Sequence, residues 1–155
     1  MADTGADPDA LRPHELAVPV PGHFDAQLWF IGRIHTPWTR RGECPRRGDA
    51  ERGPECRIEL FAPWAPGLSG IGRHDHLQIL YWMDRARRDL VMQNPNFGDA
   101  ATGTFALRSP VRPNPVASSV VRLLAVDGPV LTVRGLDCLD GTPLIDIKAE
   151  FGATP

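Results

Sequence analysis

The sequence has few cysteines and no long apolar run, and each shortage excludes a class of protein. Its three cysteines form no C-x-x-C pair, so they predict neither a disulfide framework nor a zinc knuckle. No apolar run approaches the roughly 18 to 20 residues of a bilayer-spanning helix. The first ten residues are acidic, unlike the basic and then apolar start of a secretory signal. We therefore expect a cytoplasmic protein that uses no membrane.

Proline and glycine are, by contrast, abundant. Sixteen prolines and 15 glycines occur among the 155 residues, about a fifth of the chain against a usual ~12%. Both residue types interrupt helices, which excludes an all-α bundle. The hydrophobic fraction of 42% is ordinary for one globular domain with a buried core.

Short β-compatible segments recur between turn signals. The Asp127-Gly128 pair is typical of a tight hairpin turn. The expected strands are residues 27–36, 57–64, 76–83, 104–109, 118–126, 129–135 and 143–148. About seven short, mainly antiparallel strands with at most short helices predict an all-β or mainly β protein, either a barrel or a sandwich.

Charge is distributed unevenly along the chain. Residues 1–30 hold five acidic residues and one arginine, whereas residues 31–134 hold 15 arginines against 10 acidic residues. The first segment is typical of a solvated tail. The second has two interpretations: a surface for phosphate, carboxylate or nucleic acid, or a general preference for arginine codons. Lys148 is the one lysine, and composition alone favours the second interpretation.

Two histidine positions raise the question of a metal. His74 and His76 are two residues apart, so on a strand they would share a face, a spacing compatible with metal ligation. Two ligands do not make a site, and the apolar run that follows offers no carboxylate. We expect ordinary polar or pocket-lining histidines and no metal. A metal-dependent hydrolase using these two residues is the weakest functional hypothesis, and His35 is expected to be a packed or surface histidine.

Three loops carry residues suited to binding. Residues 39–54 are rich in Arg, Gly and Pro and nearly devoid of aliphatics, which predicts a long exposed loop. Residues 108–115 contain three prolines that stiffen the backbone around two arginines and an asparagine, a pattern that favours binding. Asp137 and Asp140 lie in a Gly- and Pro-containing turn. There the carboxylates either bind a ligand or only satisfy backbone N–H groups.

Three segments together resemble the TrmO (TsaA-like) family, in its order and spacing. They are Ile31–Trp38 (IGRIHTPW), Thr104–Pro115 (TFALRSPVRPNP) and Leu136–Lys148 (LDCLDGTPLIDIK). The similarity spans about residues 28 to 149. It implies a small single-sheeted β-barrel over residues 27–150. We expect an acidic, poorly structured tail over residues 1–26 and no C-terminal accessory domain.

The resemblance also implies an activity. Members of this family transfer a methyl group from S-adenosylmethionine to N6 of threonylcarbamoyladenosine, beside the anticodon of certain tRNAs. The chain departs from the family pattern at Arg47, where the family has Gln, at Asp75, where it has Ser, and at Val116-Ala117, where it has Ile-Gly. These departures favour one alternative, an S-adenosylmethionine-binding dimer that acts as a sensor or on another small-molecule acceptor.

The family's site residues are carried over position by position. The expected cofactor-binding residues are Pro45, Arg46, Arg47, Asp75, His76, Arg108, Ser118, Asp137, Cys138, Leu139 and Asp140. The expected substrate-binding residues are Arg40, Arg41, Arg112 and Asn114. His76 and Asp140 are the expected catalytic residues, and His76 is the candidate acceptor for the proton lost from N6.

The resemblance implies a homodimer as well. A thin barrel filled with side chains has no cavity for an adenosyl group, so we expect the cofactor in a groove between two subunits. Apolar residues such as Trp29, Phe30, Trp82 and Val121 are then expected at the two-fold interface.

Overall fold

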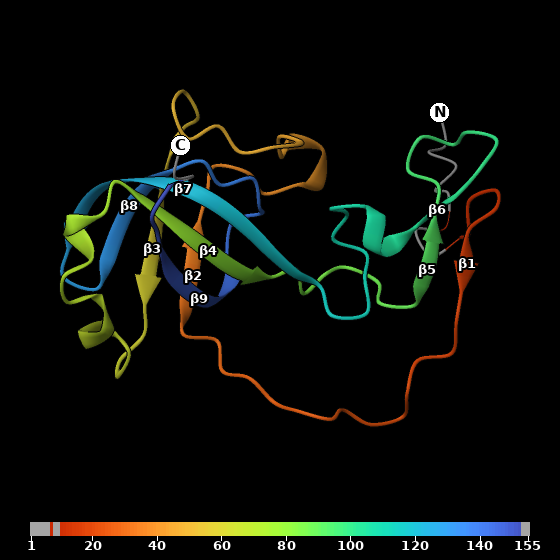
Figure 1. The fold of residues 1–155 in the computed structure, drawn as a ribbon, viewed down its shortest axis with the longest axis horizontal. Helices are drawn as coiled ribbons and strands as arrows, with labels where there is room; N and C mark the ends of the chain where they lie inside the picture. Colours follow the sequence, from red (N-terminus) through yellow and green to blue (C-terminus); the bar gives the residue numbers. More distant parts are fainter. Residues whose placement is uncertain (1–6, 8–9, 153–155) are drawn as a thin grey trace. The chain divides into compact units, whose positions relative to one another are not determined.

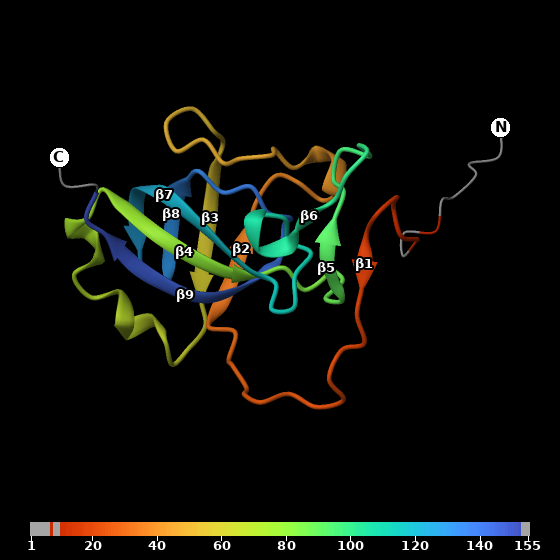
Figure 2. The same cartoon turned by 45° about the vertical axis from the view of Figure 1, so that its right-hand side comes forward.

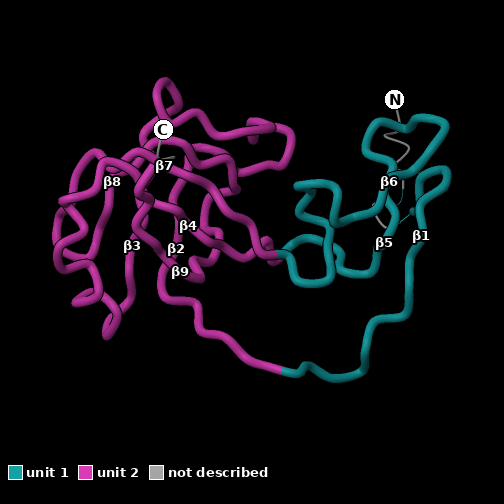
Figure 3. Tube along the Cα trace, in the orientation of Figure 1, with its two compact units in different colours: residues 1–25, 85–115 teal, residues 26–84, 116–155 magenta. Residues whose placement is uncertain are grey.

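The computed structural model describes residue 7 and residues 10–152. The chain divides into two compact units (Figure 3). Unit 1 comprises residues 1–25 and 85–115, and unit 2 comprises residues 26–84 and 116–155. The chain therefore enters each unit twice.

Unit 2 is a closed antiparallel β-barrel (Figure 1). Its strands are β2 (Gly32–His35), β3 (Glu55–Leu60), β4 (His76–Trp82), β7 (Val116–Asp127), β8 (Val130–Arg134) and β9 (Thr142–Glu150). Their order is β2-β3-β8-β7-β4-β9, and β9 pairs with β2 to close the ring. The mainly β class and the single-sheeted barrel are thus confirmed. The turn at Asp127-Gly128 joins β7 to β8 as expected, with Gly128 at φ 56°.

The barrel interior is filled by alternate residues of its strands. Along β4, Leu77, Ile79 and Tyr81 are at most 2% exposed, while their neighbours face outward. Such alternation follows from the two-residue period of a strand. Val121 also points inward and is fully buried, so its expected position at a subunit interface is wrong. Figure 2 shows β4 lying between β7 and β9.

The connections contain short 3-10 helices. They are η1 (Arg41–Glu43), η2 (Ala65–Leu68), η3 (Ile71–Arg73) and η4 (Thr104–Ala106). None of the helices in the described part of the chain has the length and apolar character needed to span a bilayer.

Unit 1 contains a three-stranded antiparallel sheet in the order β1-β5-β6. The strands are β1 (Leu16–Ala17), β5 (Leu90–Gln93) and β6 (Thr102–Gly103). The strand expected over 104–109 is wrong: these residues begin with η4. The side chain of Thr104 is buried and donates to the carbonyl of Leu90, which turns the chain back toward β5.

The expected N-terminal tail differs from the structure where it is described. Residues Leu16–Ala17 pair with β5. The Glu15 carboxylate accepts hydrogen bonds from the backbone N–H groups of Asn94 and Arg12, both at 3.0 Å. Burial opposes ionisation there, but these two bonds lower the pKa of Glu15. Residues 1–6 and 8–9 of the tail lie outside the described residues, and its boundary at residue 26 stays a prediction.

Candidate functional site

The turn before β9 closes one end of the barrel. Leu136 and Cys138 are at most 1% exposed and anchor the turn in the core. The backbone N–H of Asp140 donates to the carbonyl of Trp38 at 2.7 Å, and the Thr36 hydroxyl donates to the carbonyl of Cys138 at 2.8 Å. The two acidic residues of the turn are thus held on a fixed backbone.

The carboxylate of Asp140 is held by the end of β2. Its Oδ1 accepts a hydrogen bond from the backbone N–H of Thr36 at 3.1 Å and lies 3.7 Å from Nδ1 of His35. The other ring nitrogen of His35, Nε2, is 3.2 Å from Oε2 of Glu59. His35 therefore sits between two carboxylates, a role that the sequence did not indicate.

The carboxylate of Asp137 is held from inside the barrel. The Tyr81 hydroxyl donates to its Oδ1 at 2.7 Å and lies 2.7 Å from the Ser119 hydroxyl. The sequence pointed instead to Ser118, which is on the outer face and accepts a hydrogen bond from Gln78 at 2.9 Å. Alternate residues of β7 face the same side of the sheet. Because Val121 is buried and Ser119 lies two residues before it, Ser119 faces the interior and Ser118 faces outward.

The arginine-rich loop approaches the same end of the barrel. Gly48 lies so close to Gly135 that a Cβ at Gly48 would overlap the carbonyl oxygen of Gly135. Cys44 immediately precedes Pro45 and is close enough to Asp137 to be affected by its charge. Burial raises the pKa of Cys44, and the negative charges of Asp137 and Glu43 raise it further. The structure thus places Pro45–Arg47 beside the turn that carries Asp137.

Arg46 and Arg47 are exposed. In the described part of the chain, neither guanidinium has an ion pair or hydrogen bond. Arg40, also exposed, is 3.6 Å from Glu43. A carboxylate ligand would find in Arg46 and Arg47 two cations that no acidic side chain neutralises.

His76 lies elsewhere on the barrel. It begins β4 on the outer face, opposite Arg122 of β7 and Glu150 of β9. Tyr81, five residues further along β4, marks the end near Asp137, and five residues of strand span about 17 Å. Within one chain, His76 and its neighbour Asp75 are therefore not brought to the turn, and their expected roles stay predictions.

Three of the expected residues, Arg108, Arg112 and Asn114, belong to unit 1. The Arg112 guanidinium donates to the carbonyls of Leu107 and Ser109, at 3.0 and 2.9 Å. The Asn114 side chain accepts a hydrogen bond from Arg88 at 3.1 Å. These bonds stiffen the proline-rich loop that also carries Arg108, and the substrate contacts expected of its side chains stay predictions.

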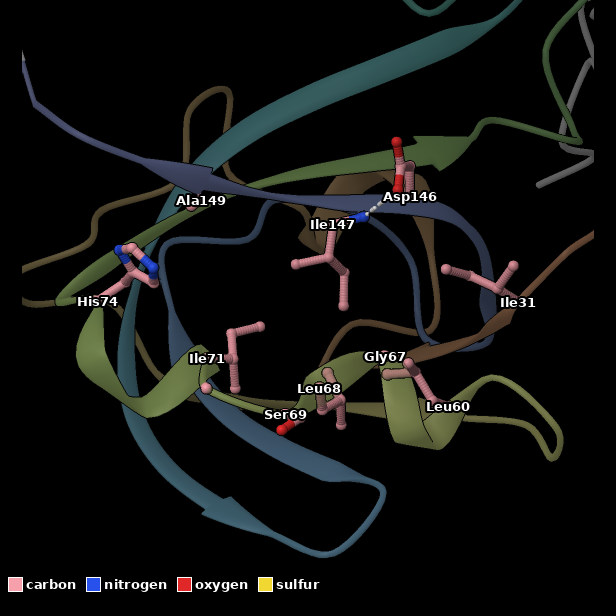
Figure 4. Close-up of a pocket in the computed structure, with 11 residues that line it drawn as sticks. Ile31, Leu60, Gly67, Leu68, Ser69, Ile71, His74, Asp146, Ile147 and Ala149 are labelled. Carbon is pink, nitrogen blue, oxygen red and sulfur yellow. Dashed lines mark hydrogen bonds between the residues drawn. The ribbon is translucent and has the colours of Figure 1, made fainter.

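A cavity of about 290 Å³ lies elsewhere in unit 2 (Figure 4). Aliphatic side chains of η2, η3 and β9 point into it, and His74 lies at its edge. None of the expected cofactor-binding or substrate-binding residues lines it. Among the described residues, no three or more His, Cys, Asp or Glu side chains are grouped as a metal site would require.

The buried thiols give the barrel an alkaline limit. Burial raises the pKa of Cys138 to about 12 and that of Cys56 to about 11, from 9.0. The unfolded chain therefore loses these protons at lower pH than the folded chain. We expect the free energy of unfolding, measured by urea titration, to fall as the pH rises from about 9 toward 12. In Cys138→Ala, the free energy of unfolding should fall less steeply over this pH range. An unchanged slope would mean that the Cys138 thiol does not cause the fall.

Comparison with protein families gives one match that spans most of the chain. Residues 33–152 match the family described as the tRNA-methyltransferase O N-terminal domain.

Individual relatives are similar over much of the chain. A probable S-adenosyl-L-methionine-binding protein, VirR, of Rhizobium radiobacter is 48% identical over 140 residues, which cover 90% of this chain and 79% of the relative. The tRNA (adenine(37)-N6)-methyltransferase of Escherichia coli is 34% identical over 132 residues, which cover 79% of this chain and 56% of that protein.

A solved structure shares the fold. The crystal structure of TrmO from Pseudomonas aeruginosa matches with a TM-score of 0.69 and 28% identity. The match covers 82% of this chain and 56% of that one. The chain thus spans little more than half the length of this structure and of the Escherichia coli enzyme.

Proposed function

Because the chain belongs to the tRNA-methyltransferase O family, we propose that it binds S-adenosylmethionine and methylates N6 of threonylcarbamoyladenosine next to the anticodon of tRNA. One observation in the structure supports this proposal most directly. The exposed Pro45–Arg47 loop and the acidic turn at Asp137 lie side by side at one end of the barrel. Cationic and anionic groups are therefore available at one place, as a zwitterionic cofactor requires.

The side chains fit the charged groups of this cofactor. Arg46 and Arg47 would pair with its carboxylate, and Asp137 and Asp140 would accept hydrogen bonds from its ammonium or ribose hydroxyl groups. When bound, S-adenosylmethionine supplies an electrophilic methyl group. The residues then contribute mainly by holding the acceptor nitrogen in line, an effect of up to ~7 to 11 kcal/mol in favourable cases.

His76 can accept the proton lost from N6 only if the chain forms a dimer. Because His76 lies about 17 Å along β4 from the end near Asp137, a second copy of the chain would have to bring it to the acceptor. The proposal therefore includes a homodimer with a shared site, in the cytoplasm where tRNA is found.

The activity is tested on tRNA from a strain that lacks its own enzyme for this methylation. With labelled S-adenosylmethionine, we expect methyl transfer to N6 of threonylcarbamoyladenosine, detected by mass spectrometry of the nucleoside digest. Arg46→Ala and Asp140→Asn should reduce it, while Gly42→Ala, in the same loop and with no atom within 4 Å of the added Cβ, is the control. Normal cofactor binding with no methyl on this nucleoside would reject the proposed substrate.

Cofactor binding has its own measurement. S-adenosylmethionine at about one hundred times its dissociation constant should raise the free energy of unfolding by ~2.7 kcal/mol, read as a thermal shift. The second candidate function is an S-adenosylmethionine-binding sensor, or an enzyme for another small acceptor. The relation to VirR favours it. A thermal shift without methylation of any tRNA would support this candidate.

A further inference from the structure

Tyr81 is a polar residue on an otherwise apolar inner face. Leu77 and Ile79 precede it on the inward-facing side of β4, and its side chain is 2% exposed. A buried hydroxyl requires a hydrogen-bond partner, since leaving it unpaired would be unfavourable. The structure satisfies it twice, with Asp137 and Ser119. A phenylalanine would fill the same space without this requirement, so the hydroxyl calls for a functional explanation.

The three groups form a hydrogen-bond chain with one consistent direction. Tyr81 has a single hydroxyl proton and donates it to Oδ1 of Asp137 at 2.7 Å. The 2.7 Å contact with Ser119 is then made by the serine hydroxyl donating to the tyrosine oxygen. Every donor is used once, and the chain ends on the carboxylate.

The second carboxylate oxygen of Asp137, Oδ2, is available to a ligand. In the described part of the chain, Oδ2 has no hydrogen bond and no ion pair. The backbone on either side is fixed, because Leu136 and Cys138 are at most 1% exposed. Asp137 is thus a half-buried carboxylate with one oxygen held from inside the barrel and the other available to a donor.

We infer that Tyr81 and Ser119 are positioning residues that orient the Asp137 carboxylate toward a hydrogen-bond donor of the bound cofactor. This inference rests on the proposed function and extends it to two residues inside the barrel. Neither touches the cofactor. They act by removing the rotational freedom of the carboxylate before binding, so that less entropy is lost when the ligand arrives.

The inference is tested by a double-mutant cycle on cofactor affinity, measured by isothermal titration calorimetry. Asp137→Ala should weaken S-adenosylmethionine binding about 10- to 100-fold, and Tyr81→Phe about 5- to 10-fold. In the Asp137→Ala background, Tyr81→Phe should have less than about a 2-fold further effect, because no carboxylate remains to be oriented. Ser119→Ala should follow Tyr81→Phe with a smaller effect.

A spectroscopic control follows from the composition. Tyr81 is the one tyrosine of the chain, so tyrosinate absorbance reports on it alone. Burial raises the pKa of Tyr81, and the charge of Asp137 raises it further. Asp137→Ala should therefore shift the tyrosinate titration to lower pH. Leu80→Ala, on the outer face of the same strand, should leave both this titration and cofactor affinity unchanged.

The outcomes separate the two proposals. If the wild-type chain binds no S-adenosylmethionine, the proposed function and this inference both fail. Suppose instead that the wild type binds the cofactor and Asp137→Ala binds it weakly. If Tyr81→Phe then binds normally, this inference fails while the proposed function stands. The inference also fails when Tyr81→Phe weakens binding equally in both backgrounds, since its effect is then independent of the carboxylate.

Discussion

Gly48→Ala is expected to reduce methyl transfer about 100-fold while the chain still folds. The added Cβ would overlap the carbonyl oxygen of Gly135, and neither backbone can rotate out of the way as a side chain would. The exposed loop must therefore move away from the barrel, taking Arg46 and Arg47 with it. Displacements of about 1 Å at a site reduce catalysis by about two orders of magnitude.

A second glycine of the same loop provides the control. A Cβ at Gly42 would have no atom within 4 Å, so Gly42→Ala should retain activity and stability. Overpacking at Gly48 should lower the free energy of unfolding by about 1 to 3 kcal/mol, measured by urea denaturation. Full activity in Gly48→Ala would show that the position of the loop does not matter for the reaction.

Ile79→Ala is expected to be more destabilising than any truncation on the outer face of β4. Ile79 is fully buried in the barrel, and removing three carbons from a closed, antiparallel core leaves a cavity that the surrounding strands cannot close. The expected loss in the free energy of unfolding is about 2 to 5 kcal/mol. Thermal and urea denaturation measure it.

The next residue of the strand tests the orientation of β4. Leu80 faces outward and is half-buried, so Leu80→Ala should be clearly less destabilising than Ile79→Ala. Ile79→Val should lose only about 0.5 to 1.5 kcal/mol. A larger loss for Leu80→Ala than for Ile79→Ala would mean that the inner and outer faces are assigned the wrong way round.

The barrel strands were predictable because short apolar runs or alternating segments lie between turn signals. β4 and β9 begin at or within one residue of the expected positions, 76 and 143. The unit 1 strands were not, because their pairing depends on side-chain bonds that have no local pattern. Gln93, for example, donates to Thr104 and to the carbonyl of Val111, at 2.9 and 2.6 Å. Such contacts connect residues 11 and 18 positions apart.

The candidate site was predictable as segments and less so as side chains. The resemblance indicated the Pro45–Arg47 loop and the turn at Asp137, and the structure places them together. It indicated neither Tyr81 nor His35, because a tyrosine in an apolar run and a histidine at the end of a strand have many ordinary explanations. Only the register of the closed barrel shows which carboxylates they face.

The pairing between β4 and β7 shows how the two units are related in the chain. Trp82 at the end of β4 faces Val116 at the start of β7 in the ladder. Topologically, residues 83–115 are therefore the loop of a β-hairpin, enlarged to carry most of unit 1. Closure entropy rises only by ~0.6 kcal/mol for each doubling of loop length. The barrel can thus carry an insert of this size between β4 and β7 without a change in the register of the two strands.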